Sequence, residues 1–197
     1  GDGLLPDALR CLDAIGVGEI VRSAGHKSST TVLFSPSLNA SEIPGEYLTI
    51  KRSLLDTIVA QKAVDMGTVF ACGEVKQLSI EPDGLVSCTI QGSEKRFRAR
   101  VGVLATGVSL KLFRKLNWDI RKKPSGVALR CYVRSSLVLD RLVIAFALND
   151  RSIIYGYGWI FPMRDGEFNV GCGLLTPGRV RKGNINLKRT FKNFIDS

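Results

Sequence analysis

The stretch from residue 155 to 173, YGYGWIFPMRDGEFNVGCG, restricts the fold more than any other part of the chain. Its large side chains recur at every second residue, at Tyr155, Tyr157, Trp159 and Phe161. A period of two puts them on one face of a β-strand, whereas a helix would spread them around its axis. The glycines fit either a hairpin with tight turns or the wall of a pocket for a flat or apolar ligand.

Other segments in the second part of the chain also alternate between apolar and other residues. They are VALRCYV (127–133), LVIAFAL (142–148) and EFNVGCGLL (167–175). Alternation of this kind is typical of antiparallel strands with one solvated face. From about residue 124 onward the sequence therefore predicts a broad antiparallel sheet, followed by a helix in NINLKRTFKNFIDS (184–197).

The first part of the chain alternates between helix-like and strand-like segments. Apolar spacing predicts a helix over 6–17, begun by a proline, and a longer helix over 52–67. The strand-like segments YLTI (47–50) and TVFAC (68–72) flank the longer helix. Strand, helix and strand in this order are typical of a parallel crossover.

Residues 75–100 predict a three-stranded meander, because a Pro-Asp-Gly turn joins the first two strands and KRFRAR (95–100) continues the pattern. VGVLA (101–105) is short and apolar, as a buried parallel strand is, and it leads into a turn and a short helix. The predicted fold class is therefore mixed, α+β or α/β. A parallel-sheet lobe with a β-meander is intergrown with an antiparallel-sheet lobe, and the seam is expected near residues 117–124.

The chain carries a net charge of +10, and basic residues are concentrated between residues 95 and 134. Asp119 is the only acidic residue in that segment. Such a segment either attracts phosphates, as in lipid headgroups and phosphorylated cofactors, or forms an ordinary solvated basic surface. Nucleic acid is not an expected partner, because the sequence has no aromatic RNA-binding motif.

The inventory of reactive side chains argues against several kinds of site. One histidine, His26, and five dispersed cysteines offer little material for a zinc site or a nucleophile–histidine pair. No metal site is expected, and the cysteines are expected to be reduced, buried thiols of a cytoplasmic protein. An integral membrane protein is not expected either, because no run approaches the roughly 20 apolar residues of a spanning helix.

Two places are candidates for contact with a phosphorylated ligand. Ala105, Thr106 and Gly107 follow one another at the carboxyl edge of the predicted parallel sheet, where ligands bind in open α/β folds. Gly107 would let backbone amides approach a phosphate, with the N-terminus of the next helix pointing there. Arg52 occupies a strand-to-helix corner suited to a phosphate or ribose. An ordinary turn and a solvated arginine are the alternatives.

Taken in order, these segments resemble the FAD-dependent oxidoreductases of the geranylgeranyl reductase type, which have a para-hydroxybenzoate hydroxylase-like fold. The similarity runs through GDGLLPDALRCLDAIGV (1–17), KRSLLDTIVAQKAVDMGTVFACGEV (51–75) and VGVLATGVSLKLFRKL (101–116). The most specific part is the family's Y-x-W-x-F-P … V-G-x-G signature. It is matched by Tyr157, Trp159, Phe161, Pro162, Val170, Gly171 and Gly173.

The resemblance implies a role for several of these residues. The positions that would contact FAD are Arg52, Val75, Ala105, Thr106 and Gly107. The positions that would line a cavity for an isoprenoid chain beside the flavin are Tyr157, Trp159, Phe161, Pro162, Gly171 and Gly173. The resemblance assigns no catalytic residue.

The same resemblance implies a division of the chain. Residues 1–118 would form a partial FAD-binding lobe, with a substrate-lobe strand embedded near 29–50, and residues 119–197 a substrate and catalytic lobe truncated at its C-terminus. Thr106 stands where the family usually has an aspartate, so a hydroxyl replaces a carboxylate near the FAD. The family's G-x-G-x-x-G unit is absent, and the chain is therefore expected to be the central part of a larger protein.

The implied function is the reduction of C=C bonds in a polyprenyl lipid or diphosphate, with FAD as cofactor and NAD(P)H as electron donor. One alternative is a flavin-dependent monooxygenase or halogenase of the same fold. Another is a non-catalytic fragment that binds an apolar ligand. The expected location is the cytoplasm, with peripheral association at the membrane surface if the basic segment binds lipid headgroups.

Overall fold

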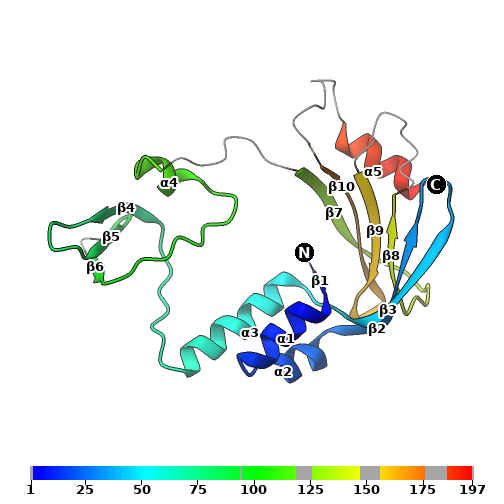
Figure 1. The fold of residues 1–197 in the computed structure, drawn as a ribbon, viewed down its shortest axis with the longest axis horizontal. Helices are drawn as coiled ribbons and strands as arrows, with labels where there is room; N and C mark the ends of the chain where they lie inside the picture. Colours follow the sequence, from blue (N-terminus) through cyan, green and yellow to red (C-terminus); the bar gives the residue numbers. More distant parts are fainter. Residues whose placement is uncertain (1, 94, 119–125, 147–155, 176–185, 197) are drawn as a thin grey trace. The chain divides into compact units, whose positions relative to one another are not determined.

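The structure, a computed structural model, describes residues 2–93, 95–118, 126–146, 156–175 and 186–196. The chain divides into two compact units, one made of residues 1–68 and 124–197 and the other of residues 69–123. Each unit has its own sheet, and Figure 1 labels the elements of both. The division into lobes at residue 118 stays a prediction.

The larger unit is built on a seven-stranded sheet with the strand order β1-β3-β2-β8-β9-β10-β7 (Figure 1). Its strands are β1 (Gly3–Leu4), β2 (His26–Phe34), β3 (Ala40–Thr49), β7 (Gly126–Arg134), β8 (Leu142–Ala145), β9 (Gly156–Pro162) and β10 (Glu167–Leu175). Neighbouring strands are antiparallel, except that β2 and β8 run parallel. The predicted antiparallel sheet is confirmed in β7 to β10, and β2 and β3 extend it.

A tight turn joins β9 and β10, the two strands of the aromatic and glycine-rich stretch. The turn contains the short 3₁₀ helix η1 (Arg164–Gly166), in which Asp165 and Gly166 have φ angles of 59° and 68°. An Asp-Gly pair tolerates positive φ at both positions, which is why this sequence can reverse direction here. The Met163 N–H donates to the Glu167 carbonyl at 2.8 Å and closes the turn. The hairpin interpretation is thereby confirmed.

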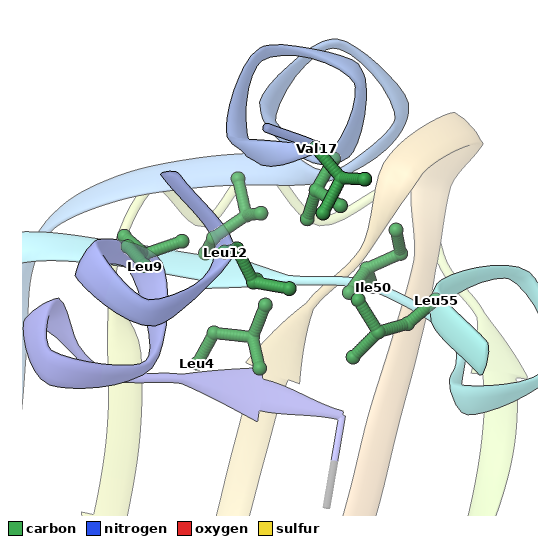
Figure 2. Close-up of a cluster of buried hydrophobic side chains, with 8 residues drawn as sticks. Leu4, Leu9, Leu12, Val17, Ile50 and Leu55 are labelled. Atoms are coloured by element: carbon green, nitrogen blue, oxygen red, sulfur yellow. The ribbon is translucent and has the colours of Figure 1, made fainter. Parts of the chain in front are cut away.

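Three helices lie together beside the β1 edge of the sheet (Figure 1). They are α1 (Pro6–Ala14), α2 (Gly18–Ala24) and α3 (Arg52–Asp65). Pro6 stands in the first turn of α1, where its missing N–H leaves no helical hydrogen bond unmade. Apolar side chains from these helices, from β1 and β3 and from the adjoining loops form one core, shown in Figure 2. Its buried members are Leu4, Leu9, Leu12, Val17, Val21, Leu48, Ile50 and Leu55.

A fourth helix, α5 (Leu187–Ile195), packs against β10 and β7, and its presence confirms the helix predicted for the last segment of the chain. Phe194 lies so close to Gly158 of β9 that a Cβ atom there would be 2.5 Å from the ring. Leu187 and Phe191 pack with Phe194 against the buried Cys172 and Leu174. The helix therefore covers one face of the hairpin. Within the described ranges, no helix is long and apolar enough to cross a membrane.

The smaller unit holds the predicted meander. Its strands are β4 (Val75–Ile80), β5 (Val86–Ile90) and β6 (Arg96–Ala99), each antiparallel to the next along the chain. The Glu81 N–H donates to the Leu85 carbonyl at 2.8 Å across the turn between β4 and β5. A short helix, α4 (Lys111–Lys115), follows the sheet. Both the meander and this helix confirm the prediction.

Two predicted strands are wrong in the structure. TVFAC (68–72) and VGVLA (101–105) have no strand pairing, and their side chains are largely exposed, with Val69 at 91% and Val103 at 84%. A strand forms only where a neighbour accepts and donates its backbone hydrogen bonds, and no described residue does so for these two segments. In the described parts of the chain, α3 therefore does not belong to a parallel crossover.

The expectation of buried thiols is wrong for Cys11 and Cys72, which are exposed. Cys11 lies on α1 at a position that faces away from the buried Leu9 and Leu12, and Cys72 lies in the unpaired segment after α3. Cys172 alone is fully buried, against α5. Burial raises the pKa of its thiol, because a thiolate loses hydration there.

We expect truncation of Leu48 to destabilise the larger unit strongly. Leu48 is 1% exposed and belongs to the core of Figure 2. Leu48→Ala should lower the free energy of unfolding by about 2–5 kcal/mol, since it leaves a cavity that the neighbouring side chains fill only in part. Ile20→Ala, at a residue of α2 that is 57% exposed, is the control and should cost less than about 0.5 kcal/mol. Urea unfolding measures both, and equal losses would show that Leu48 is not a core residue.

Candidate functional site

The aromatic side chains of β9 form a continuous row on one face of the sheet. Ring centroids are 5.7 Å apart for Tyr157 and Trp159, and 6.3 Å apart for Trp159 and Phe161. Phe146, just after β8, extends the row, with its centroid 6.2 Å from that of Tyr157. We call these four residues the ring row. The one-face arrangement expected of β9 is thus confirmed, while Tyr155 lies outside the described residues.

Gly171 gives the Trp159 indole the space to lie against β10, where the two residues are cross-strand partners. A Cβ atom at Gly171 would lie 2.3 Å from Cζ2 of Trp159 and 2.7 Å from the carbonyl oxygen of Leu129. Any side chain there would displace the ring or the backbone. At Gly173 a Cβ atom would lie 3.7 Å from Cζ3 of Trp159 and 3.8 Å from Cε1 of Tyr157, which is ordinary contact. Of the two signature glycines, Gly171 alone is sterically required here.

The ring row is partly core and partly surface. Trp159 is 9% exposed, Tyr157 and Phe161 are half-buried, and Phe146 is 47% exposed. Pro162, at the end of β9, is buried, and its carbonyl accepts a hydrogen bond from the Thr49 hydroxyl. This anchors the end of β9 to β3. The rings therefore form an apolar surface on a rigid strand, in contrast to the opposite face, which α5 covers.

A polar residue that sequence reasoning missed holds the indole of Trp159. The Nε1–H of Trp159 donates to Oδ1 of Asn169 at 2.9 Å, and Nδ2 of Asn169 donates to Oδ2 of Asp2 at 2.6 Å. Asn169 and Asp2 are each 2% exposed. A signal for Asn169 existed in the sequence, because it stands in the same alternation as Gly171 and Gly173 and is the one polar residue among them.

Asp2 is a buried carboxylate with several donors. The Tyr132 hydroxyl donates to its Oδ2, and Nη1 of Arg130 lies 3.3 Å from the same oxygen. The backbone N–H of Arg52 donates to Oδ1 at 3.3 Å. Hydrogen bonds from neutral donors, together with the ion pair with Arg130, offset much of the cost of removing a carboxylate from water. Burial raises the pKa of Tyr132, and its bond to Asp2 adds to the effect.

Cationic side chains surround Tyr132 on the same part of the sheet. Lys51 Nζ is 5.0 Å and the Arg130 guanidinium carbon 4.7 Å from the centre of its ring, within the range of cation–π attraction. Lys51 also forms an ion pair with Glu167 at 2.5 Å, and Arg134 lies 3.6 Å from the same carboxylate. Lys51 in particular holds the pKa of Glu167 below its usual range. Glu167 should therefore stay ionised to a lower pH than an unpaired glutamate.

Arg52, predicted to contact a cofactor, begins α3. Its side chain is half-exposed and forms an ion pair with Asp56, one turn along the helix, at 2.6 Å. A phosphate at Arg52 would compete with a surface pair of this kind, which is worth only about 0.3–0.5 kcal/mol. The hydrogen bond from the backbone N–H of Arg52 to Asp2 therefore holds the residue in place, while its side chain remains available to bind a phosphate.

The other residues predicted to contact the cofactor belong to the smaller unit. Ala105, Thr106 and Gly107 share one turn, in which Gly107 has a φ of 57° and open space where a Cβ atom would be. The Thr106 hydroxyl donates to the Ser109 carbonyl at 2.6 Å. The next helix, α4, spans five residues and begins at Lys111, so the expected helix N-terminus does not directly follow Gly107. These three residues thus lie together in the smaller unit, whereas Arg52 belongs to the larger unit.

Val75 lines an apolar cavity of about 310 Å³ inside the smaller unit. The cavity lies among the meander, the segment after it and α4, and its lining includes Leu78, Val86, Phe97, Leu112 and Trp118. Phe113 packs edge-on against Trp118 with the ring centroids 5.8 Å apart. Because the lining is almost entirely apolar, the cavity is not suited to binding a phosphate or a sugar. For Val75, contact with a cofactor stays a prediction.

We expect the two signature glycines to respond differently to substitution. Gly171→Ala should lower the free energy of unfolding by about 1–3 kcal/mol, because the added methyl group overlaps Trp159 and the Leu129 carbonyl. Gly173→Ala is the matched control, and should be neutral or stabilising by about 0.5–1 kcal/mol, since the methyl group meets its neighbours at ordinary distance. Urea unfolding gives the free energies and near-ultraviolet circular dichroism reports the indole environment. Equal effects would show that the indole does not rest on Gly171.

Comparison with known proteins gives relatives along the whole chain. No protein-family profile matches it. The menaquinone reductase of Mycobacterium tuberculosis is 28% identical over 210 residues, which cover 100% of this chain and 50% of that protein. The digeranylgeranylglycerophospholipid reductase of Methanosarcina acetivorans is 29% identical over 142 residues, which cover 69% of this chain and 35% of that protein. The chain thus spans about half the length, or less, of these curated relatives.

Solved structures share the fold. A geranylgeranyl bacteriochlorophyll reductase-like protein from Thermoplasma acidophilum superposes with a TM-score of 0.78 at 19% identity, covering 100% of this chain and 51% of that one. HpxO of Klebsiella pneumoniae, in complex with FAD and uric acid, gives a TM-score of 0.67 at 14% identity and covers 97% of this chain and 52% of that one. The mixed fold with its separate meander is therefore that of flavoprotein hydroxylases and reductases. Together, the relatives and the shared fold support the resemblance to FAD-dependent oxidoreductases of the geranylgeranyl reductase type.

Proposed function

We propose that this chain is part of an enzyme that uses FAD to reduce C=C bonds in a polyprenyl lipid or polyprenyl diphosphate. The observation that carries the proposal is the ring row, an apolar surface held on a rigid strand. Relatives of the chain are named as reductases of a digeranylgeranyl lipid and of menaquinone, which supports a polyprenyl substrate. In this proposal Tyr157, Trp159 and Phe161 contact the prenyl chain, and Pro162, Gly171 and Gly173 shape the strands that carry them.

Residues of the chain fit a role in holding FAD. Gly107 combines a positive φ with open space, so that backbone groups there are accessible to a large polar ligand. Arg52 presents a half-exposed guanidinium suited to phosphate oxygens. With Val75, Ala105 and Thr106 these residues are the proposed FAD contacts. When bound, FAD would supply the hydride, with NAD(P)H as the proposed electron donor.

The protein's own part in such a reaction would be orientation and the exclusion of water. The exposed parts of Phe146, Tyr157 and Phe161 are mostly apolar, and Trp159, which is 9% exposed, packs between Tyr157 and Phe161. Contact between the ring row and a prenyl chain would remove both surfaces from water and fix the chain along β9. The glycines of β10 have no side chains that would displace the rings of the neighbouring strand β9.

A flavin-dependent monooxygenase or halogenase is the second candidate. It is favoured by fold neighbours such as 2-methyl-3-hydroxypyridine-5-carboxylic acid oxygenase, with a TM-score of 0.70. Against it stands the ring row, because an apolar surface running through four aromatic residues suits a long hydrocarbon chain better than a small polar aromatic acid. A fragment that binds an apolar ligand without catalysis is the third candidate, and FAD titration distinguishes it from the other two.

We also propose a cytoplasmic protein that associates peripherally with membranes and not with nucleic acid. Support comes from basic residues of the smaller unit whose side chains are exposed, such as Lys95, Arg100 and Lys111. Arg98 is less available, since it pairs with Glu81 at 2.8 Å and with Asp83 at 2.5 Å. Exposed lysine and arginine side chains contribute attraction to anionic lipid headgroups.

Truncation of the ring row should weaken the binding of long prenyl chains selectively. In the FAD-loaded protein, Trp159→Ala should raise the KM for geranylgeranyl diphosphate about tenfold, equivalent to 1.4 kcal/mol, because loss of the middle ring breaks the apolar surface on which a long chain would lie. The KM for dimethylallyl diphosphate should change far less, since a five-carbon chain reaches few rings. Trp118→Ala, in the smaller unit, is the control. Equal changes for both substrates would mean that Trp159 is only a core residue.

FAD binding should depend on Gly107 more than on a glycine of similar backbone conformation. Gly107→Val places a branched side chain at a φ of 57° and fills the open space, so we expect the Kd for FAD to rise at least about tenfold. Gly92→Val is matched, because Gly92 has a φ of 75° and similar open space in the turn between β5 and β6. Flavin fluorescence during titration gives both constants. A similar loss in both variants would remove Gly107 from the list of FAD contacts.

A further inference from the structure

The indole N–H of Trp159 is linked to the buried carboxylate of Asp2 through the side-chain amide of Asn169. The chain of contacts runs from indole Nε1 to Oδ1 of Asn169 at 2.9 Å, and from Nδ2 of Asn169 to Oδ2 of Asp2 at 2.6 Å. All three residues are nearly inaccessible to water, with exposures of 9%, 2% and 2%. In such surroundings each hydrogen bond is costly to leave unmade.

The chemistry at the two ends dictates an amide in the middle. An indole N–H can only donate, and an ionised carboxylate can only accept. A residue between them must therefore accept on one side and donate on the other, which Asn169 does with its oxygen and its nitrogen. An aliphatic side chain of the same size would leave the indole N–H and one carboxylate lone pair without a partner.

Asp2 keeps its place without Asn169. Its carboxylate also accepts from the Tyr132 hydroxyl and the Arg52 backbone N–H, and pairs with Arg130 at 3.3 Å. The Asp2 carbonyl accepts from the Ile50 N–H at 2.9 Å, which fixes the backbone as well. The carboxylate is thus a fixed point tied to several elements, while among the described residues the indole N–H donates to Asn169 alone.

We propose that Asn169 is a positioning residue, which orients the Trp159 indole over Gly171 with Asp2 as its anchor. The orientation matters because Trp159 is the middle of the ring row, 5.7 Å from Tyr157 and 6.3 Å from Phe161. A rotated indole would interrupt the apolar surface between its two neighbours. The effect on prenyl binding rests on the proposed function, whereas the effect on the indole itself does not.

The test uses a Trp118→Phe background, in which Trp159 is the only tryptophan of the chain. Asn169→Leu removes both hydrogen bonds at similar volume, so acrylamide should quench Trp159 more strongly than in the parent and the fluorescence anisotropy of Trp159 should fall. Tyr132→Phe is the matched control, because it removes one donor to Asp2 without touching the amide. Its Trp159 signals should stay at the parent values. Unchanged signals in Asn169→Leu, or equal changes in the control, would overturn the positioning role.

Asn169→Asp gives a reversible version of the same test within one folded molecule. The carboxyl introduced at position 169 would face Asp2 directly, and two adjacent buried carboxylates share a proton, so it should stay protonated well above the roughly 3.9 of a free aspartate. Arg130, which lies 3.3 Å from Oδ2 of Asp2, and Lys51 oppose this shift, whereas Glu167 and the burial of both positions favour it. Protonated, the carboxyl can donate to Asp2 and accept from Trp159, as the amide does. Quenching should thus be at the parent level at low pH and rise with pH, a transition that the parent lacks.

Binding of geranylgeraniol then separates this inference from the proposed function. If both are right, the parent binds it, and Asn169→Leu binds about tenfold more weakly while Tyr132→Phe does not. If the parent shows no binding but the quenching results hold, the proposed function fails and the positioning role stands. If the parent binds and Asn169→Leu binds equally well, with unchanged quenching, the positioning role fails and the proposed function stands.

Discussion

The larger unit depends on one buried charge, the carboxylate of Asp2, which is 2% exposed. Burying an unpaired carboxylate would cost several kcal/mol or more, so the donors that surround it are a condition of this fold. They come from separate places in the chain: the start of α3, strand β7 through Tyr132 and Arg130, and strand β10 through Asn169. This one residue near the start of the chain thereby ties β7 and β10 to α3.

A second constraint is steric and acts on the candidate site. The indole of Trp159 and the backbone of β10 occupy adjacent space, and only glycine at position 171 allows both. The hydrogen bond to Asn169 fixes the ring's edge, and the missing side chain at Gly171 gives room for its face. Glycine therefore stands opposite Trp159 because the indole occupies the space that a side chain at position 171 would fill.

Local patterns in the sequence predicted much of this fold. The period of two in β9, the Pro-Asp-Gly turn between β4 and β5 and the helix near the end of the chain all depend on nearby residues, and the structure confirms them. TVFAC (68–72) and VGVLA (101–105) have the same apolar, β-branched character but are not strands, because strand formation needs a partner and the sequence of one segment does not supply it. Asn169 was missed for a related reason, since its partners Asp2 and Trp159 are 167 and 10 residues away.

The sequence by itself determined the class of the elements, the shared face of the rings in β9 and the resemblance to a flavoprotein family. These follow from side-chain periodicity and turn chemistry, which act over a few residues. Only the tertiary structure decided that Gly171 is required while Gly173 has room for a methyl group, and that a carboxylate at position 2 anchors the indole at position 159. The physical reason is that steric fit and hydrogen bonding act between atoms close in space, and the packing of β7, β10 and α3 alone brings these residues together.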